Sequence, residues 1–302
     1  MTPFELAFDA QAELGEGPVW SQESGTLLWL DIYRALLHSF DPETGTDTST
    51  RMPSAIGAVV PRVRGGLVAA LADGFWSVDL ELAKIELLVA LSAPSPKLRI
   101  NDGKCDSLGR FWAGTISVPQ RGSKFGDYAA YSKEGTLYRL DGSHELSPAL
   151  TGVTLSNGMD WSPDSRLFYY VDSATQRLDC FDFDLNSGNI GNRRVLVDLA
   201  GSDVFIDGMT VDAEGGIWLA VHGLETSCVQ RYSASGKLEE VLPLPVLGIT
   251  SCTFGGALLD VLFVTTKRVG LSASELSENP MSGGIFRCKP GAVGLPPNPY
   301  RG

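Results

Sequence analysis

Short hydrophobic runs recur along the whole chain, and a cluster of turn-forming residues follows most of them. The runs are rich in Val, Ile, Leu, Trp, Phe and Tyr, which favour the pleated surface of a β-sheet. Clear examples are "TLLWLDI", "GLVAAL", "RFWAGTI", "GTLYRLD", "RLFYYVDS", "GIWLAV" and "VLFVTT". Helical spacing is scarce: "DLELAKIELL" hints at a helix, but its neighbours favour two strands joined by a turn. The pattern therefore predicts an all-β chain.

The runs belong to a repeating unit, which consists of a polar or glycine position, a strand, a tight turn and a second strand. Six copies can be aligned, with first positions spaced by 41 to 56 residues. These first positions are Glu16, Gly57, Asn101, Asn157, Asp207 and Ser251. Each interval has room for two further strands, and four strands repeated six times predict a six-bladed β-propeller with four antiparallel strands per blade. We expect residues 1–302 to form a single propeller domain with a loosely attached tail at about 289–302; a pair of β-sandwiches is the alternative.

The propeller brings four of these polar positions together. The innermost strand of every blade begins at the same end of the central channel, so Glu16, Asn101, Asn157 and Asp207 should converge there. Two carboxylates in a confined space repel each other, and their burial is costly unless a cation or a proton compensates. The first positions include no Lys or Arg, so a bound cation is expected. Oxygen ligands suit a hard divalent ion such as Ca²⁺, Mg²⁺ or Mn²⁺, and Zn²⁺ also accepts carboxylates.

Composition narrows the partners. The net charge is −12 and no basic run occurs, which argues against nucleic acid and anionic membranes and favours a small molecule or a cation. The five cysteines form no C-x-x-C pair and are expected to be free thiols, mostly buried. The first residues show no export signal, so a cytoplasmic location is expected, as a monomer or small homo-oligomer.

The segments that carry the polar positions resemble the motifs of the gluconolactonase, regucalcin and luciferin-regenerating-enzyme family. They are "LGEGPVW", "RINDGKCDSLGRFWAGT", "LSNGMDWSPDSRLFYYVDS", "IDGMTVDAEGGIWLA" and "CTFGG", in the order of that family. The resemblance implies a six-bladed propeller with one divalent ion in the channel, and several members hydrolyse sugar-acid lactones. Its metal ligands correspond to Glu16, Asn157 and Asp207, and Asp207 is also the expected general base. It further implies that Arg99 and Asn101 bind substrate hydroxyls and that Asp102 supports the site from behind.

The chain departs from the sugar-lactonase pattern after "GTI", where acidic residues usually contact the sugar. Here "GTISVPQ" places Ser117, Val118 and Pro119 at these positions, and the segment that follows, "QRGSKFGDYAAYSKEG" (120–135), could form a flap over the channel mouth. This departure leaves a less polar lactone or ester open as the substrate. Of the three histidines, His222 lies nearest to a motif, but we interpret it as an ordinary histidine at a strand end.

Three functions remain open at this point. The first is a metal-dependent hydrolase that opens an aldonolactone or a similar lactone with metal-activated water. The second is an esterase or phosphotriesterase-like hydrolase that uses the same ion. The third is a calcium-binding propeller without enzymatic activity. A serine hydrolase and a dinucleotide-binding enzyme are not expected, because neither G-x-S-x-G nor a suitably placed G-x-G-x-x-G occurs.

Overall fold

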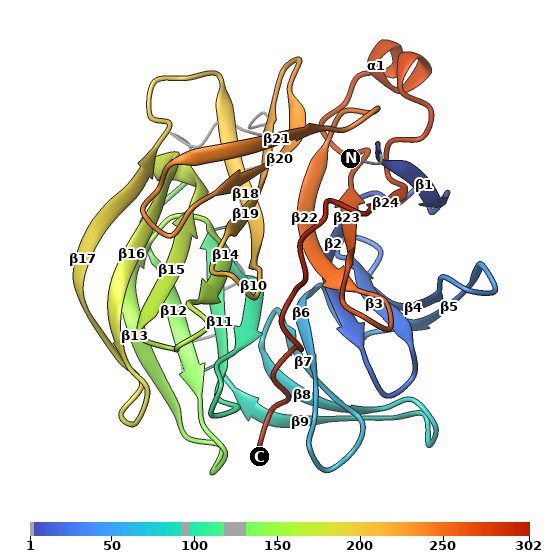
Figure 1. Ribbon diagram of the computed structural model, residues 1–302. Helices are drawn as coiled ribbons and strands as arrows, with labels where there is room; N and C mark the ends of the chain where they lie inside the picture. Colours follow the sequence, from blue (N-terminus) through green and yellow to red (C-terminus); the bar gives the residue numbers. More distant parts are fainter. Residues whose placement is uncertain (1–2, 92–96, 118–130) are drawn as a thin grey trace.

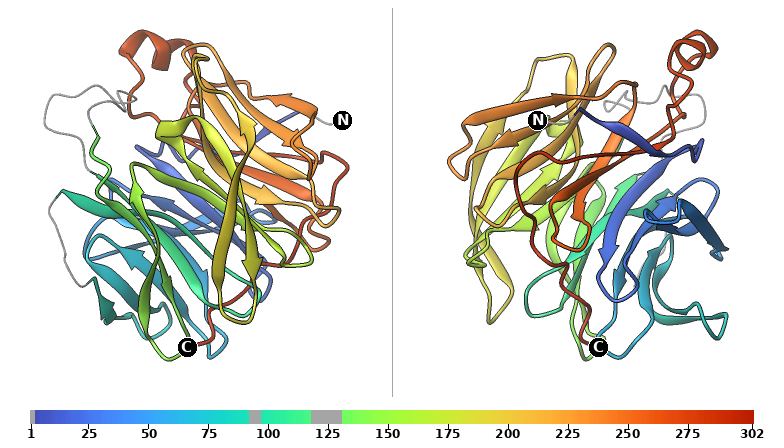
Figure 2. Two further views of the ribbon diagram at one scale, coloured as in Figure 1. Left: turned by 90° about the vertical axis from the view of Figure 1, so that its left-hand side faces the viewer. Right: turned by 45° about the vertical axis from the view of Figure 1, so that its right-hand side comes forward.

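The computed structural model describes residues 3–91, 97–117 and 131–302, and within them it has six four-stranded antiparallel sheets (Figure 1). The sheets are arranged around a central axis, as the turned views in Figure 2 also show. The predicted all-β, six-bladed propeller is therefore confirmed. Each predicted strand listed above forms a strand, and "DLELAKIELL" contains the turn and strand expected rather than a helix.

Five sheets take their strands in chain order. The first sheet contains β2 (Gly15–Ser21), β3 (Thr26–Asp31), β4 (Leu36–Asp41) and β5 (Thr46–Arg51), and the second contains β6 (Ile56–Pro61), β7 (Leu67–Leu71), β8 (Gly74–Asp79) and β9 (Lys84–Ala90). The third contains β10 (Leu98–Cys105), β11 (Phe111–Ser117), β12 (Gly135–Leu140) and β13 (Leu146–Val153), and the fourth contains β14 (Ser156–Trp161), β15 (Leu167–Asp172), β16 (Arg177–Asp184) and β17 (Asn189–Asp198). The fifth contains β18 (Val204–Val211), β19 (Ile217–Gly223), β20 (Ser227–Tyr232) and β21 (Leu238–Pro243). A single 3₁₀ turn, η2 (Ser173–Thr175), follows β15 in the described part of the chain.

The sixth sheet closes the ring with both ends of the chain. It contains β22 (Ile249–Gly255), β23 (Val261–Thr266), β24 (Ile285–Cys288) and, as its outer strand, β1 (Glu5–Phe8). β1 pairs antiparallel with β24, with Glu5 opposite Arg287. The sequence repeat begins only at Glu16, so it did not assign this N-terminal strand.

The ring is held together by hydrophobic contacts between neighbouring sheets. The first strand of each sheet contacts the first strands of both neighbours, and β22 contacts β2 to complete the circle. Each pair of adjacent sheets encloses a cluster of buried apolar side chains, for example Trp112, Phe168 and Phe183 between the third and fourth sheets. Since side chains of both faces of a sheet are buried in this way, central strands such as β7 and β11 are buried along their whole length.

One α-helix was not expected from the sequence. Within the described residues it is α1 (Ala273–Glu278), located between β23 and β24. Ser272 caps it by accepting a hydrogen bond from the Glu275 backbone N–H, and the Glu275 side chain accepts one from the Ser272 N–H. This reciprocal pair is a capping box, and the S-x-x-E spacing in "LSASELSE" was the available signal.

The C-terminal segment is bound firmly, in contrast to the loose tail expected for 289–302. In Figure 1 it runs down the middle of the view, from β24 past β22 and β6, to the C-terminus at the bottom. The side chain of Tyr300 is completely buried, and its hydroxyl donates a hydrogen bond of 2.6 Å to the Asp141 carbonyl. Its backbone N–H donates to the Pro61 carbonyl at 2.8 Å. Gly294 forms an isolated bridge with Asp212, which directly follows β18. Proline blocks regular strand pairing, but it leaves these separate contacts available, which is why composition alone was misleading.

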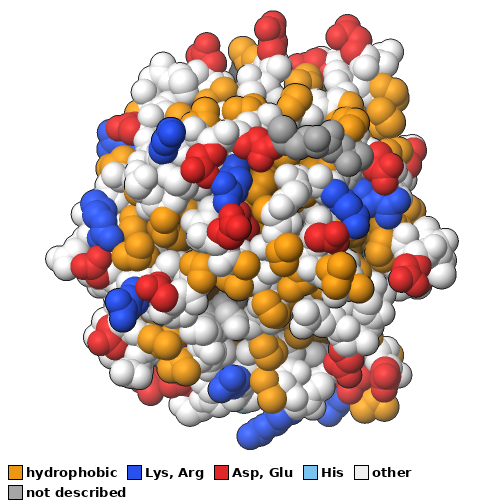
Figure 3. All heavy atoms as spheres, viewed as in Figure 1, with side chains coloured by type: hydrophobic (Ala, Val, Ile, Leu, Met, Phe, Trp, Pro, Cys, Tyr) orange, Lys and Arg blue, Asp and Glu red, His pale blue; other side chains and the backbone are white. Residues whose placement is uncertain are grey.

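Charged side chains lie on the surface, and the cysteine thiols lie in the interior. Figure 3 shows acidic and basic side chains interspersed with hydrophobic ones over the face it presents. All five cysteines are buried and free, as predicted. Among the described residues, no helix is long and apolar enough to cross a membrane.

Candidate active site

The predicted site residues lie where the first strand of each sheet is irregular. In all six sheets the pairing between the first and second strands shifts register near the first position of the repeat. The shift leaves Asn101, Asn157 and Asp207 out of the ladder, and it follows directly after Glu16. Such β-bulges redirect a side chain, and here they turn the polar residues toward the channel. In the sixth sheet the skipped residue is Thr250, one position before the predicted Ser251.

Glycines beside the bulges allow the first strands to approach one another. A Cβ on Gly158 would lie 2.8 Å from the Asp207 carbonyl oxygen, and a Cβ on Gly208 would lie 2.1 Å from the Ser251 hydroxyl oxygen. No side chain fits at such distances, so glycine after Asn157 and Asp207 is required by packing around the axis.

The two amides are joined by a hydrogen bond. The Asn101 Nδ2 donates to the Asn157 Oδ1 at 3.0 Å and to the Ser156 carbonyl at 2.9 Å. Asn157 in turn donates through its Nδ2 to the Ser173 hydroxyl at 2.8 Å, and Ser173 donates to the Ile206 carbonyl at 2.6 Å. This chain of bonds connects three sheets and fixes the Asn157 side-chain oxygen on the side of Asn101.

The two carboxylates are buried and interact electrostatically. Glu16 is 8% exposed and Asp207 is 7% exposed. Burial, and then the negative charges of Asp207 and Asp102, raise the pKa of Glu16 well above its ordinary value, while a hydrogen bond from the Gly17 N–H opposes the rise. Asp207 also contacts His222, with 3.4 Å between its Oδ2 and the His222 Nε2. The contact corrects our interpretation of His222 as an ordinary strand-end histidine.

A second ring of residues surrounds the first and was missed by the sequence analysis. In each sheet the residue just before the repeat's first position (in the sixth sheet, just before the skipped Thr250) pairs with a residue of the second strand, so the residue that follows this partner lies at the same mouth of the channel. These following residues are Ile32, Ala72, Ile116, Ser173, His222 and Lys267. The repeat contained this signal, because each of them ends or directly follows one of the hydrophobic runs quoted above.

Lys267 changes the electrostatic picture drawn from the sequence. The first positions lack a cation, as stated above, but the second ring supplies one: Lys267 is 4% exposed and its Nζ lies 3.5 Å from the His222 Nε2. Burial lowers the pKa of Lys267, and the charges of Asp207 and Glu16 partly offset that effect. A bound ion is therefore not the sole source of positive charge available to the two carboxylates.

The remaining predicted residues lie beside the amides on β10. The buried Arg99 donates to the Ile100 carbonyl at 3.1 Å, and its guanidinium carbon lies 5.9 Å from the centre of the Tyr33 ring. Asp102 accepts a hydrogen bond of 2.7 Å from the Gly103 N–H. Burial raises the pKa of Asp102 to about 6, although the Gly103 N–H and the charge of Lys104 oppose the shift.

Part of the predicted substrate region cannot be placed. Val118, Pro119 and most of the suggested flap fall in 118–130, outside the described residues. Ser117 is described: it is buried, and its hydroxyl donates to the Ser132 carbonyl at 3.1 Å. Next to it, Ile116, Tyr131 and Leu155 form a small buried apolar cluster.

The donor set fits a hard divalent cation. Glu16 and Asp207 carry carboxylate oxygens, and Asn157 carries an amide oxygen. Burial, and then the charges of Asp207 and Asp102, raise the pKa of Glu16, so a nearby cation would favour its ionised form. Among the described residues, no three His, Cys, Asp or Glu side chains are grouped to hold a metal, so the amide oxygen is essential to this set.

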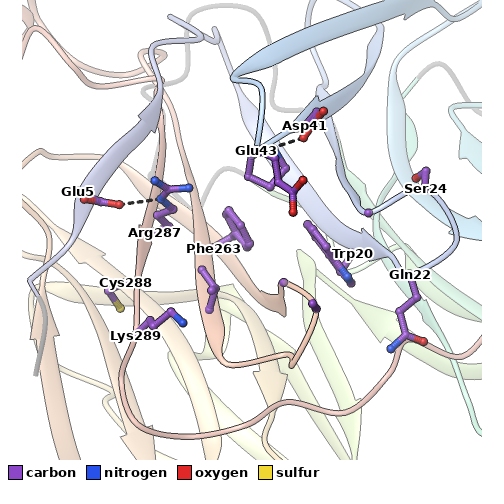
Figure 4. A pocket seen from close by; sticks show the side chains of 15 residues that line it. Glu5, Trp20, Gln22, Ser24, Asp41, Glu43, Phe263, Arg287, Cys288 and Lys289 are labelled. Atoms are coloured by element: carbon purple, nitrogen blue, oxygen red, sulfur yellow. Dashed lines mark hydrogen bonds and ion pairs between the residues drawn. The ribbon is translucent and has the colours of Figure 1, made fainter.

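A cavity of about 860 Å³ lies elsewhere, between the first and sixth sheets, over the stacked rings of Trp20 and Phe263 (Figure 4). Arg287 on its wall pairs with Glu5, and Lys289 pairs with Asp260 outside the cavity lining. Because these cations already have partners and no predicted site residue lines the cavity, we place the site at the channel mouth. Neighbouring sheets diverge with distance from the central axis, which leaves space between the outer parts of the first and sixth sheets.

A second cavity occupies the other end of the channel. It measures about 470 Å³ and is lined by Lys104, Asp160 and the segment 295–299 of the C-terminal tail. Lys104 and Asp160 form an ion pair of 2.7 Å. The tail therefore covers the end of the channel opposite the candidate site.

Comparison with known proteins gives consistent matches over nearly the whole chain. Regucalcin from Oryctolagus cuniculus is 34% identical over 299 residues, which cover 99% of this chain and 98% of that protein. A Bacillus subtilis (strain 168) protein with the provisional name sugar lactone lactonase YvrE is 34% identical over 298 residues, which cover 98% of both chains. The crystal structure of a calcium-binding regucalcin from Agrobacterium tumefaciens superposes with a TM-score of 0.91 at 26% identity, covering 99% of this chain and 98% of that one.

A family model agrees with these relatives. Residues 14–268 match the SMP-30/Gluconolactonase/LRE-like region, a span that contains every predicted site residue from Glu16 to Asp207 as well as His222 and Lys267. The chain therefore belongs to the SMP-30/gluconolactonase/LRE-like family.

Proposed function

We propose that this protein hydrolyses a lactone, the cyclic ester of a hydroxy acid, at the channel mouth marked by Glu16 and Asp207. The observation that carries the proposal is the pairing of two buried carboxylates with the joined amides of Asn101 and Asn157. The family includes proteins named as lactonases, and one relative, YvrE, is provisionally named a sugar lactone lactonase.

A divalent ion fits this site as its cofactor. Glu16, Asn157 and Asp207 would hold it through oxygen atoms, with Ca²⁺, Mg²⁺, Mn²⁺ and Zn²⁺ as candidates. Calcium has one further support, because the similar Agrobacterium tumefaciens regucalcin is described as a calcium-binding protein. When bound, the ion would supply positive charge to the carbonyl oxygen and acidify water.

Asp207 is the residue assigned to the proton transfer. Its carboxylate would accept a proton from the attacking water, whose oxygen forms a bond to the lactone carbonyl carbon. The bond between that carbon and the ring oxygen would then break, and the ring oxygen would take up the proton from Asp207 to give the open hydroxy acid. His222, 3.4 Å from the Asp207 Oδ2, would hold the carboxylate in position during this exchange.

Asn101 and Arg99 are assigned to the substrate. Both are buried at the mouth. The Arg99 guanidinium can donate hydrogen bonds to ring hydroxyls, and the Asn101 side-chain oxygen can accept them, because the Asn101 N–H groups already donate to Asn157 and Ser156. The apolar cluster of Ile116, Tyr131 and Leu155 lies next to them and favours a lactone that also carries an apolar part. An apolar contact to the substrate also agrees with the lack of acidic residues directly after "GTI", where sugar lactonases usually carry them.

Hydrolysis is tested with a panel of aldonolactones, substituted lactones, aryl esters and organophosphates. The protein is first stripped with a chelator and then reloaded separately with each of the four ions. We expect turnover of a lactone, and a loss of about 10²–10⁴-fold in kcat/KM for Asp207→Ala and Asp207→Asn. The matched control is Asp260→Asn, the same change at a surface ion pair, which should keep full activity.

The outcomes separate the candidate functions. Full activity of the Asp207 variants, or of exhaustively chelated protein, would refute the proposed reaction. Turnover of aryl esters or organophosphates in preference to every lactone would support the esterase alternative. Binding of calcium without turnover of any panel member would support a calcium-binding propeller.

A further inference from the structure

Lys267 is a buried cation that the proposed reaction does not use. It directly follows β23 and is therefore the sixth sheet's member of the second ring. Its backbone is fixed, because its N–H donates to the Gly248 carbonyl at 2.8 Å and it forms an isolated bridge with Leu14. Leu14 immediately precedes the strand that carries Glu16, so the lysine is anchored beside that carboxylate.

The side chain of Lys267 points toward the two acids. Its Nζ lies 3.5 Å from the His222 Nε2, and that nitrogen lies 3.4 Å from the Asp207 Oδ2. The lysine charge also acts on Glu16, whose pKa it lowers against the effect of burial. Because Lys267 is only 4% exposed, its charge is screened less than that of a surface lysine. The built-in positive charge of Lys267 thus faces the two carboxylates that are proposed to hold the ion.

We infer that Lys267 is an internal counter-cation that competes electrostatically with a divalent ion for Glu16 and Asp207, so that the site binds the ion more weakly than its carboxylates alone would. The inference rests on the proposed metal centre, but it does not depend on the hydrolytic reaction. It assigns Lys267 a role in metal affinity rather than in substrate binding.

The size of the effect follows from Coulomb repulsion. For a divalent ion bound about 7–10 Å from the ammonium, at an effective dielectric constant of about 35–50, the repulsion would weaken binding by roughly ten- to hundredfold. Removing the charge should tighten binding by this factor. It should also destabilise the metal-free protein, because the carboxylates lose the cation that offsets their repulsion.

The test compares metal binding by the wild-type protein and by Lys267→Met, which keeps the length of the side chain and removes its charge. Calorimetric titrations with Ca²⁺ and with Mn²⁺ follow chelation, at one pH and without substrate. Lys289→Met is the matched control, since it removes the same charge from a surface ion pair with Asp260. Lys267→Gln and Lys267→Arg complete the series.

We expect Kd to fall ten- to hundredfold in Lys267→Met and Lys267→Gln, and to change less than twofold in Lys289→Met. Lys267→Arg should not bind more tightly than wild type. Thermal unfolding should show a larger metal-induced rise in Tm for Lys267→Met than for wild type, which reports the same competition independently of calorimetry.

Each other result counts against the inference. Equal or weaker metal affinity in folded Lys267→Met and Lys267→Gln refutes it while leaving the metal centre intact. A raised KM with unchanged Kd would make Lys267 a substrate ligand instead. Absence of binding by every variant refutes the metal centre, and the inference with it.

Discussion

Replacing Asp102 by asparagine should stabilise the metal-free protein at pH 8. Burial is the main reason that the pKa of Asp102 is raised, to about 6 from an ordinary 3.8. Because the folded state binds the proton more tightly than the unfolded state does, the wild-type protein loses stability as the pH rises from about 4 through 6. Asparagine carries no charge and keeps an oxygen for the Gly103 N–H, which now donates to Asp102 at 2.7 Å.

The magnitude follows from the shift. About two pKa units correspond to about 3 kcal/mol in the free energy of unfolding at pH 8. Asp102 retains some exposure to the channel, which reduces the cost of its charge, so we expect a gain of about 1–2 kcal/mol. For a chain of this length such a gain raises Tm by about 2–3 °C.

The assay is urea unfolding followed by tryptophan fluorescence, in the presence of a chelator, at pH 4.5, 6 and 8. The advantage of Asp102→Asn over wild type should be greatest at pH 8 and should shrink toward pH 4.5. Asp260→Asn, the same change at a surface ion pair, should alter stability by less than about 1 kcal/mol at every pH. An equal or lower stability of Asp102→Asn at pH 8, or an advantage independent of pH, would refute the reasoning.

Three further predictions concern packing and metal binding. Tyr300→Ala should lower the free energy of unfolding by about 3–5 kcal/mol, and Tyr300→Phe by about 1 kcal/mol, in urea titrations, because the ring is completely buried and its hydroxyl is bonded; wild-type stability of Tyr300→Ala would show that the tail is loose. Gly158→Ala should cost more than about 2 kcal/mol and reduce activity, since the new Cβ would lie 2.8 Å from the Asp207 carbonyl, whereas Gly191→Ala meets nothing within 4 Å and should be neutral; equal effects of the two would contradict the packing argument. A divalent ion at 100 times its Kd should stabilise the wild-type protein by about 2.7 kcal/mol in thermal unfolding, and Glu16→Gln should lose this gain; a full gain in the variant would exclude Glu16 as a ligand.

The sequence predicted the ring because each repeat carries the same alternation of polar position, strand and turn. It also located Glu16, Asn101, Asn157 and Asp207, since equivalent repeat positions converge in a propeller. Whether these residues bind metal and substrate remains a prediction. The bulges that turn their side chains inward depend on pairing between strands, which periodicity does not reveal.

Other features depend on contacts between distant segments. Lys267 and His222 were missed because only first-strand positions were compared, although both follow aligned hydrophobic runs. The bound tail was missed because a proline- and glycine-rich composition says nothing about the surface that receives it. β1 lies outside the repeat, so only the ring's need for a twenty-fourth strand could have indicated it.

The pairing of β1 with β24 imposes a delay during protein synthesis. β1 ends at Phe8 and its partner begins at Ile285, so the ribosome must add about 280 residues between them. At about 5–20 residues per second, this takes roughly 15–60 s. Throughout that time β1 has no partner strand, and the nascent protein carries an exposed, pairing-competent segment. Five sheets can assemble as they emerge, but the circle is completed only when the last strand has been translated.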